Sequence, residues 1–165
     1  MSRGDVFIED WDKLERDLKK FPDLLDRNIK KATKASAISA RDHVKVYINL
    51  GGRDWPPLKE ATIKRKGSSK PLIDHGDLLN SVVCKMITGY MFFVGVPRNV
   101  KKKNKKMVNI AAVHEYGAPD QNIPARPFIE PGLESATKSI INRYKIGLLS
   151  TLRGRLYNDS VRGLD

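Results

Sequence analysis

Apolar residues recur at steps of three or four positions in two long stretches of the chain. The first stripe lies between Pro22 and Leu50 and consists of Leu25, Ile29, Ala32, Ser36, Ala40, Val44 and Tyr47. The second follows Pro131 and consists of Leu133, Ala136, Ile140, Tyr144, Leu148 and Leu152. This spacing predicts two amphipathic helices, over residues 22–50 and 131–156. Several positions of the first stripe are small, which permits a close approach between helices.

The segment before Pro22 predicts two shorter elements. Val6–Ile8 is an apolar run typical of a strand, and Asp10 is a suitable N-cap for a helix that runs toward Phe21. Pro22 is expected to interrupt this helix, because proline is best tolerated in a first turn. Gly51-Gly52 is expected to end the next helix, since glycine adopts the left-handed cap conformation cheaply.

Two short helices are predicted between the long ones. Pro57 at a first helical position and Gly67 beyond the last position bracket a helix over residues 58–66. Asp74 is expected to cap another helix, which runs to about Ser81.

Apolar runs with turn signals between them predict a hairpin in the middle of the chain. The expected strands are residues 82–88 and 91–96, with a tight turn at Gly89-Tyr90. Residues 98–107 are expected to form a loop, and residues 109–116 suit a short helix.

Together these elements predict an α+β fold, in which a small antiparallel sheet packs against two long helices. We expect one domain over residues 1–159, with its core at about 22–156 and a flexible tail at 160–165.

An extended, proline-rich arm is predicted at residues 123–131. Its prolines fix their own backbone and push the preceding residues to extended geometry. A pre-ordered arm loses little entropy when it docks, and arginine and phenylalanine are enriched at interface cores. Two uses remain open, contact with another subunit and an intrachain strap over the sheet. The candidate interface residues are Pro124, Arg126, Pro127, Phe128 and Ile129.

Positive charge is concentrated in two stretches. The chain has 31 Lys and Arg residues against 19 Asp and Glu residues, and the excess lies mostly at residues 59–70 and 98–106. Such clusters suit phosphate groups or an acidic partner. Three uses of the second stretch stay open: a solvated loop, contact with an acidic protein surface, and contact with DNA. Its candidate residues are Arg98, Lys101, Lys102, Lys103, Lys105 and Lys106.

The sequence gives little indication of catalysis, and we expect no catalytic residue, metal or cofactor. The three histidines lack the spacing of metal ligands. His114 and Glu115 are adjacent on a predicted helix and face different directions, which ill suits a shared substrate. Asp74 and its neighbours fit helix capping better than cation binding. Cys84 is expected to be a small buried hydrophobe, and a single cysteine excludes an intrachain disulfide.

No segment predicts a membrane helix or a signal peptide. The longest apolar run, around Met91–Val96, is far shorter than the roughly 20 residues that a spanning helix needs. We therefore expect a soluble protein that is made inside the cell.

An ordered series of short motifs resembles the phage virion morphogenesis family, the tail completion proteins of Mu-like and P2-like phages and the related tail-to-head joining proteins. The motifs are Trp55-Pro56-Pro57-Leu58, Ala61-Thr62-Ile63, Arg65-Lys66-Gly67, the stretch from Pro71 to Ser81, Val94-Gly95-Val96, Val113 to Gly117, and Ile123 to Phe128. The resemblance covers about residues 50–135. The matching motif residues include Trp55, Asp74, Gly76, Leu78, Ser81, His114, Glu115 and Gly117.

The resemblance implies a structural virion protein that is not an enzyme. Such a protein completes the tail and joins it to the head at the neck, as a ring that is usually a hexamer. The implied partners are copies of itself, tail tube or tail terminator proteins, head-completion or connector proteins, and genomic DNA contacted non-specifically in the lumen, with no membrane. The implied location is the head–tail junction of the virion, and the host cytoplasm during assembly.

Two competing functions follow from the residues alone. A non-specific nucleic-acid-binding protein would use residues 59–70 and 98–106, and its affinity would fall steeply with salt. A metal-dependent nuclease would need His75 or His114 and is the weaker alternative.

Overall fold

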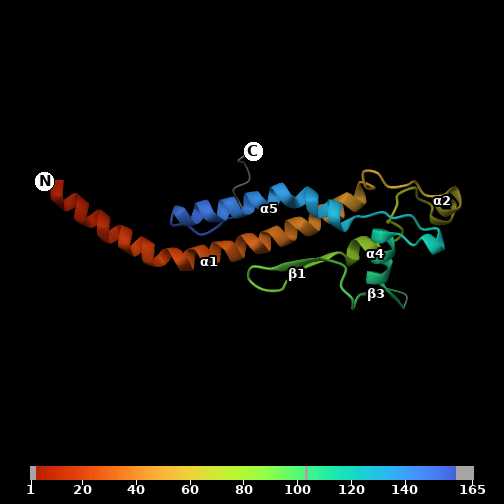
Figure 1. Ribbon diagram of the computed structural model, residues 1–165, viewed down its shortest axis with the longest axis horizontal. Coiled ribbons are helices and arrows are strands. Elements are labelled where there is room, and N and C mark those ends of the chain that lie inside the picture. Colours follow the sequence, from red (N-terminus) through yellow and green to blue (C-terminus); the bar gives the residue numbers. More distant parts are fainter. Residues whose placement is uncertain (1–2, 103, 159–165) are drawn as a thin grey trace.

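The computed structural model describes residues 3–102 and 104–158, and it is a mixed helix-and-strand fold with small antiparallel sheets (Figure 1). Lys103 and the expected flexible tail at 160–165 lie outside the described residues. Along the chain the elements are α1 (Arg3–Asn49), α2 (Glu60–Lys66), α3 (Asp77–Ser81), β1 (Val83–Met86), β2 (Phe92–Gly95), β3 (Lys101–Lys102), β4 (Lys105–Lys106), α4 (Met107–Tyr116), a 3-10 turn η1 (Pro119–Gln121) and α5 (Ile129–Leu152).

Helix α1 is continuous and contains Pro22, so the expected strand at Val6–Ile8 and the expected break at Pro22 are both wrong. Proline costs about 3 kcal/mol inside a helix. The surrounding residues are mostly Leu, Lys, Arg, Asp and Glu, and the packed second half of the helix supplies the stability that outweighs this cost. Figure 1 shows α1 changing direction within its red-to-orange half, as a helix does at a proline.

The contact between α1 and α5 is the most extensive between two elements, and small residues bring the helices close. Ala32, Ala40 and Ala136 are fully buried. A Cβ atom added at Gly132 would lie 2.7 Å from the Cα of Val44, so only glycine fits there. The close approach predicted from the small stripe positions is therefore confirmed.

Asn28 joins the end of α5 to α1. Its side-chain amide donates to the Thr151 hydroxyl and to the Arg155 carbonyl, both at 2.9 Å. The backbone N–H of Tyr157 donates to the Asn28 amide oxygen at 2.7 Å. These bonds hold the segment after α5 against α1 at Asn28. The part of α1 before Asn28 extends past the end of α5 (Figure 1).

The predicted central hairpin is confirmed, with shorter strands and a longer turn. β1 and β2 pair antiparallel from Val83 with Gly95 to Met86 with Phe92, and residues 87–91 connect them in place of a two-residue turn. The turn is held on α1, because the Tyr90 hydroxyl donates to Asp26 and the ammonium of Lys30 lies 5.4 Å from the centre of the Tyr90 ring. Figure 1 shows this hairpin and α5 on opposite sides of α1.

The two short helices α2 and α3 begin later than the sequence predicts. The predicted helix over 58–66 begins at Glu60, and Gly67 closes it in the left-handed conformation. The expected Asp74 cap is wrong, because Gly76 precedes α3 with a φ of 76° and no side chain caps that helix.

The lysine-rich segment is a small hairpin, so the expected plain loop at 98–107 is wrong. Lys101 pairs with Lys106 and Lys102 with Lys105. Asn104 has a φ of 62°, and asparagine tolerates this conformation in tight hairpin turns.

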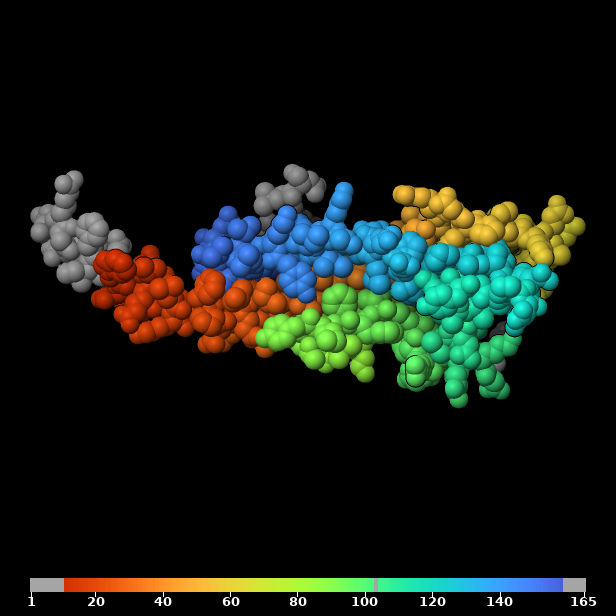
Figure 2. All heavy atoms as spheres, in the orientation of Figure 1, coloured from red at the N-terminus to blue at the C-terminus, as the bar shows by residue number. Residues whose placement is uncertain are grey.

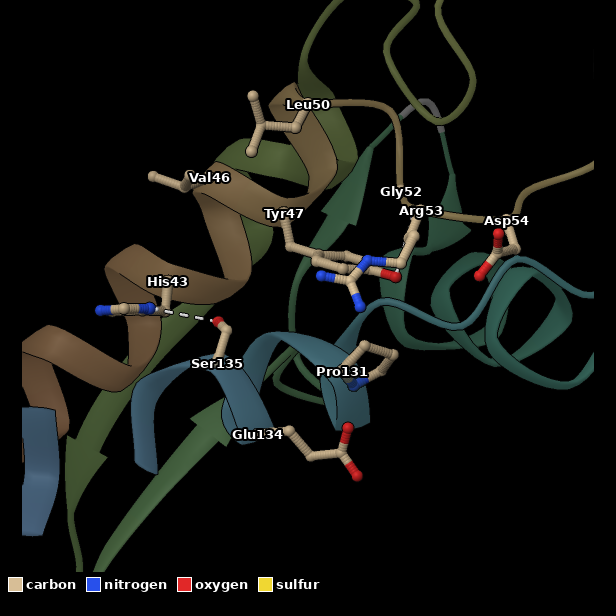
Figure 3. A pocket seen from close by; sticks show the side chains of 10 residues that line it. All are labelled: His43, Val46, Tyr47, Leu50, Gly52, Arg53, Asp54, Pro131, Glu134 and Ser135. Carbon is tan, nitrogen blue, oxygen red and sulfur yellow. Dashed lines mark hydrogen bonds between the residues drawn. The ribbon is translucent and has the colours of Figure 1, made fainter. Parts of the chain in front are cut away.

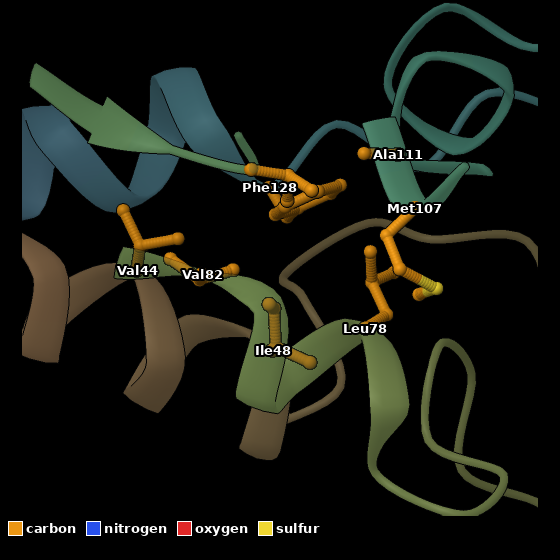
Figure 4. Close-up of a cluster of buried hydrophobic side chains, with 8 residues drawn as sticks. Val44, Ile48, Leu78, Val82, Met107, Ala111 and Phe128 are labelled. Carbon is orange, nitrogen blue, oxygen red and sulfur yellow. The ribbon is translucent and has the colours of Figure 1, made fainter. Parts of the chain in front are cut away.

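The main hydrophobic core lies where the second half of α1, the hairpin β1–β2, α3 and α4 meet (Figure 4). Its buried members are Val44, Ile48, Leu78, Val82, Val96, Met107, Ala111 and Phe128. Phe128 is fully buried and is among the largest of the fully buried side chains. The core therefore depends on the proline-rich arm.

Candidate functional site

The proline-rich arm lies on its own chain as a strap, one of the two uses that the sequence left open, and its candidate interface residue Phe128 belongs to the core. Phe128 has no exposed surface, and Arg126 is 5% exposed. Pro124 is exposed, whereas Pro127 and Ile129 are half-buried. Of the five candidate interface residues, Pro124 alone is fully open to a partner in this conformation.

The strap is clamped to the loop that follows α1. The Arg126 guanidinium donates to the Pro56 carbonyl at 2.9 and 3.1 Å and to the Pro57 carbonyl at 3.3 Å. In return, the indole N–H of Trp55 donates to the Pro127 carbonyl at 2.9 Å. Motifs about 70 positions apart therefore hold each other, and the Trp55 and Arg126 positions of the motif series have a structural role.

Glu115 of α4 supplies the N-terminal cap of α5. Its carboxylate accepts hydrogen bonds from the backbone N–H groups of Phe128 at 2.8 Å, Ile129 at 3.1 Å and Glu130 at 3.4 Å. These are the groups that a helix start leaves without intrahelical partners, and the helix dipole favours a negative charge there. The residue at the N-cap position, Phe128, makes no side-chain cap, and Glu115, 13 positions earlier on α4, takes that role.

The other motif residues around the strap shape the backbone. Gly117 has a φ of 80°, and a Cβ atom there would lie 3.0 Å from the backbone nitrogen of Ala125. Leu78 is buried, and the Ser81 hydroxyl donates to its carbonyl at 2.6 Å. These residues fit packing and turn formation rather than catalysis.

A basic pocket of about 400 Å³ brings together the two basic stretches. Arg65 and Lys66 of α2 line it beside Lys102 and Lys105 of the second hairpin. The other polar and ionisable residues at its wall are Thr62, Asp74, His75, Asp77 and His114. Lys102 pairs with Asp77 at 3.1 Å, which leaves a net positive wall. Arg98, Lys101 and Lys106 are exposed, but they do not line this pocket.

The electrostatics of the pocket reflect burial and neighbouring cations. Burial lowers the pKa of His114 below its usual range, and Arg126 and Lys66 lower it further. The Nδ1 atom of His114 is buried and makes no hydrogen bond to any of the residues that the structure describes. Burial also lowers the pKa of Lys66, while Asp74 opposes that shift. An anion in this pocket would relieve the repulsion among these groups.

A second pocket, of about 770 Å³, lies between the end of α1 and the start of α5 (Figure 3). Val46 is 53% exposed and Leu50 79% exposed at its wall. Arg53 and Glu134 lie at its other side, and His43 hydrogen-bonds to Ser135 at 3.1 Å. Apolar walls with a few charged and polar residues beside them are typical of a binding pocket.

The first half of α1 has an apolar face that nothing in the described chain covers. Every side chain from Trp11 to Lys20 is exposed, and the exposed fractions are 67% for Trp11, 45% for Leu14 and 61% for Leu18. Figure 2 shows this red segment projecting past the blue surface of α5. The sequence analysis did not identify this face, because it expected the helix to be interrupted at Pro22. The signal was present, since steps of three and four connect Trp11, Leu14 and Leu18.

Sites of other kinds are not found in the described part of the chain. No group of three or more His, Cys, Asp or Glu residues is placed to hold a metal ion within residues 3–102 and 104–158. Over the same ranges, no helix combines the length and apolar character that a membrane crossing requires.

Comparison with known proteins finds an archaeal relative. The chain is 38% identical over 91 residues to the uncharacterized protein MJ0331 of Methanocaldococcus jannaschii. The match covers 52% of this chain and 62% of the archaeal protein, so this chain spans less than two thirds of its relative. No protein-family profile matches the chain, and no solved structure matches it.

Proposed function

We propose that this chain is a structural phage virion protein that completes the tail and joins it to the head, acting as a ring-forming assembly factor. The observation that carries the proposal is the apolar surface left uncovered on α1, which is 67% exposed at Trp11 and 61% exposed at Leu18. A monomeric protein rarely exposes a continuous apolar face, and such a face marks a protein contact. The ordered motifs that resemble the tail completion family support the same assignment.

The fold suits a repeated building block. We take the chain as one domain in which α1 and α5, with the β1–β2 hairpin on α1, form the body and the strap closes the core. Its partners are other copies in a ring, a tail tube or terminator protein, and a head-completion or connector protein. Its location is the neck of the virion, after assembly in the host cytoplasm.

The direct test is the particle phenotype of a deletion. Cells that produce the phage without this gene are expected to release full heads beside unjoined tails, seen by negative-stain electron microscopy. Complementation with the wild-type gene in trans controls for effects on neighbouring genes. Joined, infectious particles in the deletion lysate would contradict the proposal.

A second candidate function is non-specific nucleic-acid binding, and the basic pocket favours it. The pocket joins residues 59–70 to residues 98–106, which brings two positively charged stretches to one place on the surface. A lysine cluster of this kind neutralises phosphates without selecting bases.

This candidate is tested by replacing Lys101, Lys102, Lys105 and Lys106 with glutamine. If the function is correct, DNA affinity drops at least tenfold, and the slope of log affinity against log salt falls by up to about 0.9 for each phosphate that is no longer neutralised. The matched control replaces Lys13, Lys19, Lys20 and Lys145, which changes the net charge equally. Equal losses in both variants would point to net charge alone and would reject a dedicated site.

A further inference from the structure

The apolar stripe of α1 continues past the end of the helix that covers it. Ala32 and Ser36 belong to the buried part of the α1 stripe, and Asn28, which hydrogen-bonds to Thr151, lies at the level where α5 ends. Trp11, Leu14 and Leu18 extend the same stripe toward the N-terminus, because the steps of three and four carry on through Pro22. Half of one continuous helix face is therefore buried and the other half exposed.

Helix α5 has an uncovered apolar stripe of its own. Ile141 is 49% exposed, Leu148 46% and Leu152 64%. Steps of seven and four residues place these three side chains on one helix face. That face differs from the face of Ala136 and Gly147, which is buried on the side of α1, so the sequence prediction that Leu148 and Leu152 share the face of Ala136 is wrong. The second stripe is thus available to another molecule.

The charged residues that flank the two stripes have opposite signs. On α1, Glu15 lies one turn from Trp11 and from Leu18, and Asp17 lies one turn from Leu14, whereas the bases Lys13, Arg16 and Lys20 fall on the opposite face of the helix. On α5, Lys145 lies one turn from Ile141 and from Leu148, and the stretch from Lys138 to Arg155 has five basic residues and no acidic one. Opposite charges favour the encounter of these segments, and like charges oppose the pairing of either segment with itself. Charge thus selects the pairing of one stripe with the other.

One chain cannot bring its own two stripes together. The first turns of α1 point away from the body, past the end of α5 (Figure 1). The contact must then form between copies, with the first half of α1 from one copy on the outer face of α5 from the next. Such a contact is heterologous, and it closes into a ring when the rotation between copies allows.

We propose that Trp11, Leu14 and Leu18 of one copy pack against Ile141, Leu148 and Leu152 of a neighbouring copy. This inference rests on the proposed function, because it names the self-contact of the ring. The partner is a second copy of this chain, and no other virion protein is needed to cover either stripe.

The test uses two double variants of the full chain, L14S/L18S and L148S/L152S. All four positions are exposed, so the monomer is expected to stay folded, with an unchanged circular dichroism spectrum and melting temperature. Each variant is expected to associate at least about a hundredfold more weakly than the wild type in sedimentation velocity, since two leucines no longer bury apolar surface at the interface. The control R16S/K20S changes the opposite face of the same turns and is expected to associate normally.

Mixing the two variants distinguishes the proposed contact from other arrangements. The α1 stripe of L148S/L152S and the α5 stripe of L14S/L18S are both intact, so an equimolar mixture is expected to form one-to-one heterodimers that do not grow further. A contact of α1 with α1 would instead leave L148S/L152S self-associating, and a contact of α5 with α5 would leave L14S/L18S self-associating. Either result overturns the inference.

The inference and the proposed function can fail separately. A wild-type chain that stays monomeric at its highest attainable concentration, or variants that associate like the wild type, overturns the inference. If the deletion lysate contains unjoined heads and tails, the proposed function is supported even when the self-contact is rejected. If deletion particles are joined while the two variants behave as expected, the self-contact stands and the proposed function fails.

Discussion

The strap at residues 123–129 and the first half of α1 place their apolar side chains in opposite environments. Phe128 of the strap is fully buried in the core of its own chain, whereas Trp11 near the start of α1 is 67% exposed. The strap has backbone partners on two sides, in the loop after α1 and at Glu115, and the first turns of α1 extend beyond the end of α5. The comparison teaches that proline stiffness does not tell which residues meet a partner. An apolar side chain is buried where another element of the same chain packs over it, and it stays exposed to a partner where no such element is present.

The largest effect is expected from emptying the core position of the strap. Phe128→Ala should lower the free energy of unfolding by about 3–5 kcal/mol, because it removes a fully buried aromatic ring and leaves a cavity. Denaturant unfolding measures this loss. The contrast variant is L14S/L18S, which should change the free energy by less than about 0.5 kcal/mol because both side chains are exposed. Similar losses of unfolding free energy in the two variants would contradict the assignment of Phe128 to the core and of Leu14 and Leu18 to the exposed surface.

A smaller effect is expected from removing the cap of α5. Glu115→Ala should cost about 1–2 kcal/mol of stability, since three backbone N–H groups lose their acceptor and the helix start loses a favourable charge. The exposed Glu134→Ala variant, one turn further along α5, serves as the control. Equal stability of the two variants would show that the strap is not held at Glu115.

The smallest effect is a dependence of stability on pH at His114. Its pKa is lowered in the folded chain by burial and by Arg126 and Lys66. Around pH 6 the unfolded chain therefore binds more protons at this histidine than the folded chain does, and stability falls as the pH drops below about 6.5. Unfolding measured from pH 7.5 to 5 should show a shallower decline in His114→Gln than in the wild type. A wild-type slope in His114→Gln would reject the assignment.

The helices and the central hairpin were predictable, because their signals are local. Periodicity defined the packed half of α1 and most of α5, and the glycine at 67 marked the end of α2 correctly. The continuity of α1 was not predictable from Pro22 alone, since a local cost of about 3 kcal/mol competes with the propensity and packing of a long helix. The lysine hairpin was missed because its strands are two residues each and consist of lysine.

The candidate site was predictable only in part. The prolines indicated an extended segment, but the side on which Phe128 lies depends on Trp55 and Glu115, which are distant in sequence. The convergence of the two basic stretches at one pocket is also a long-range event, because α2 and the second hairpin are about 35 positions apart in the sequence. The exposed stripe of α1 had a local signal, and the assumed break at Pro22 concealed it.

Pro22 separates the covered half of α1 from the uncovered half. Proline has no N–H to donate to the carbonyl of Leu18, so one hydrogen bond of the helix is absent where its support ends. A helix that lacks a hydrogen bond at one turn bends there more readily than in a fully bonded stretch, and a bend at Pro22 leaves the core undisturbed. The angle at Pro22 therefore sets the direction in which the projecting turns meet a partner.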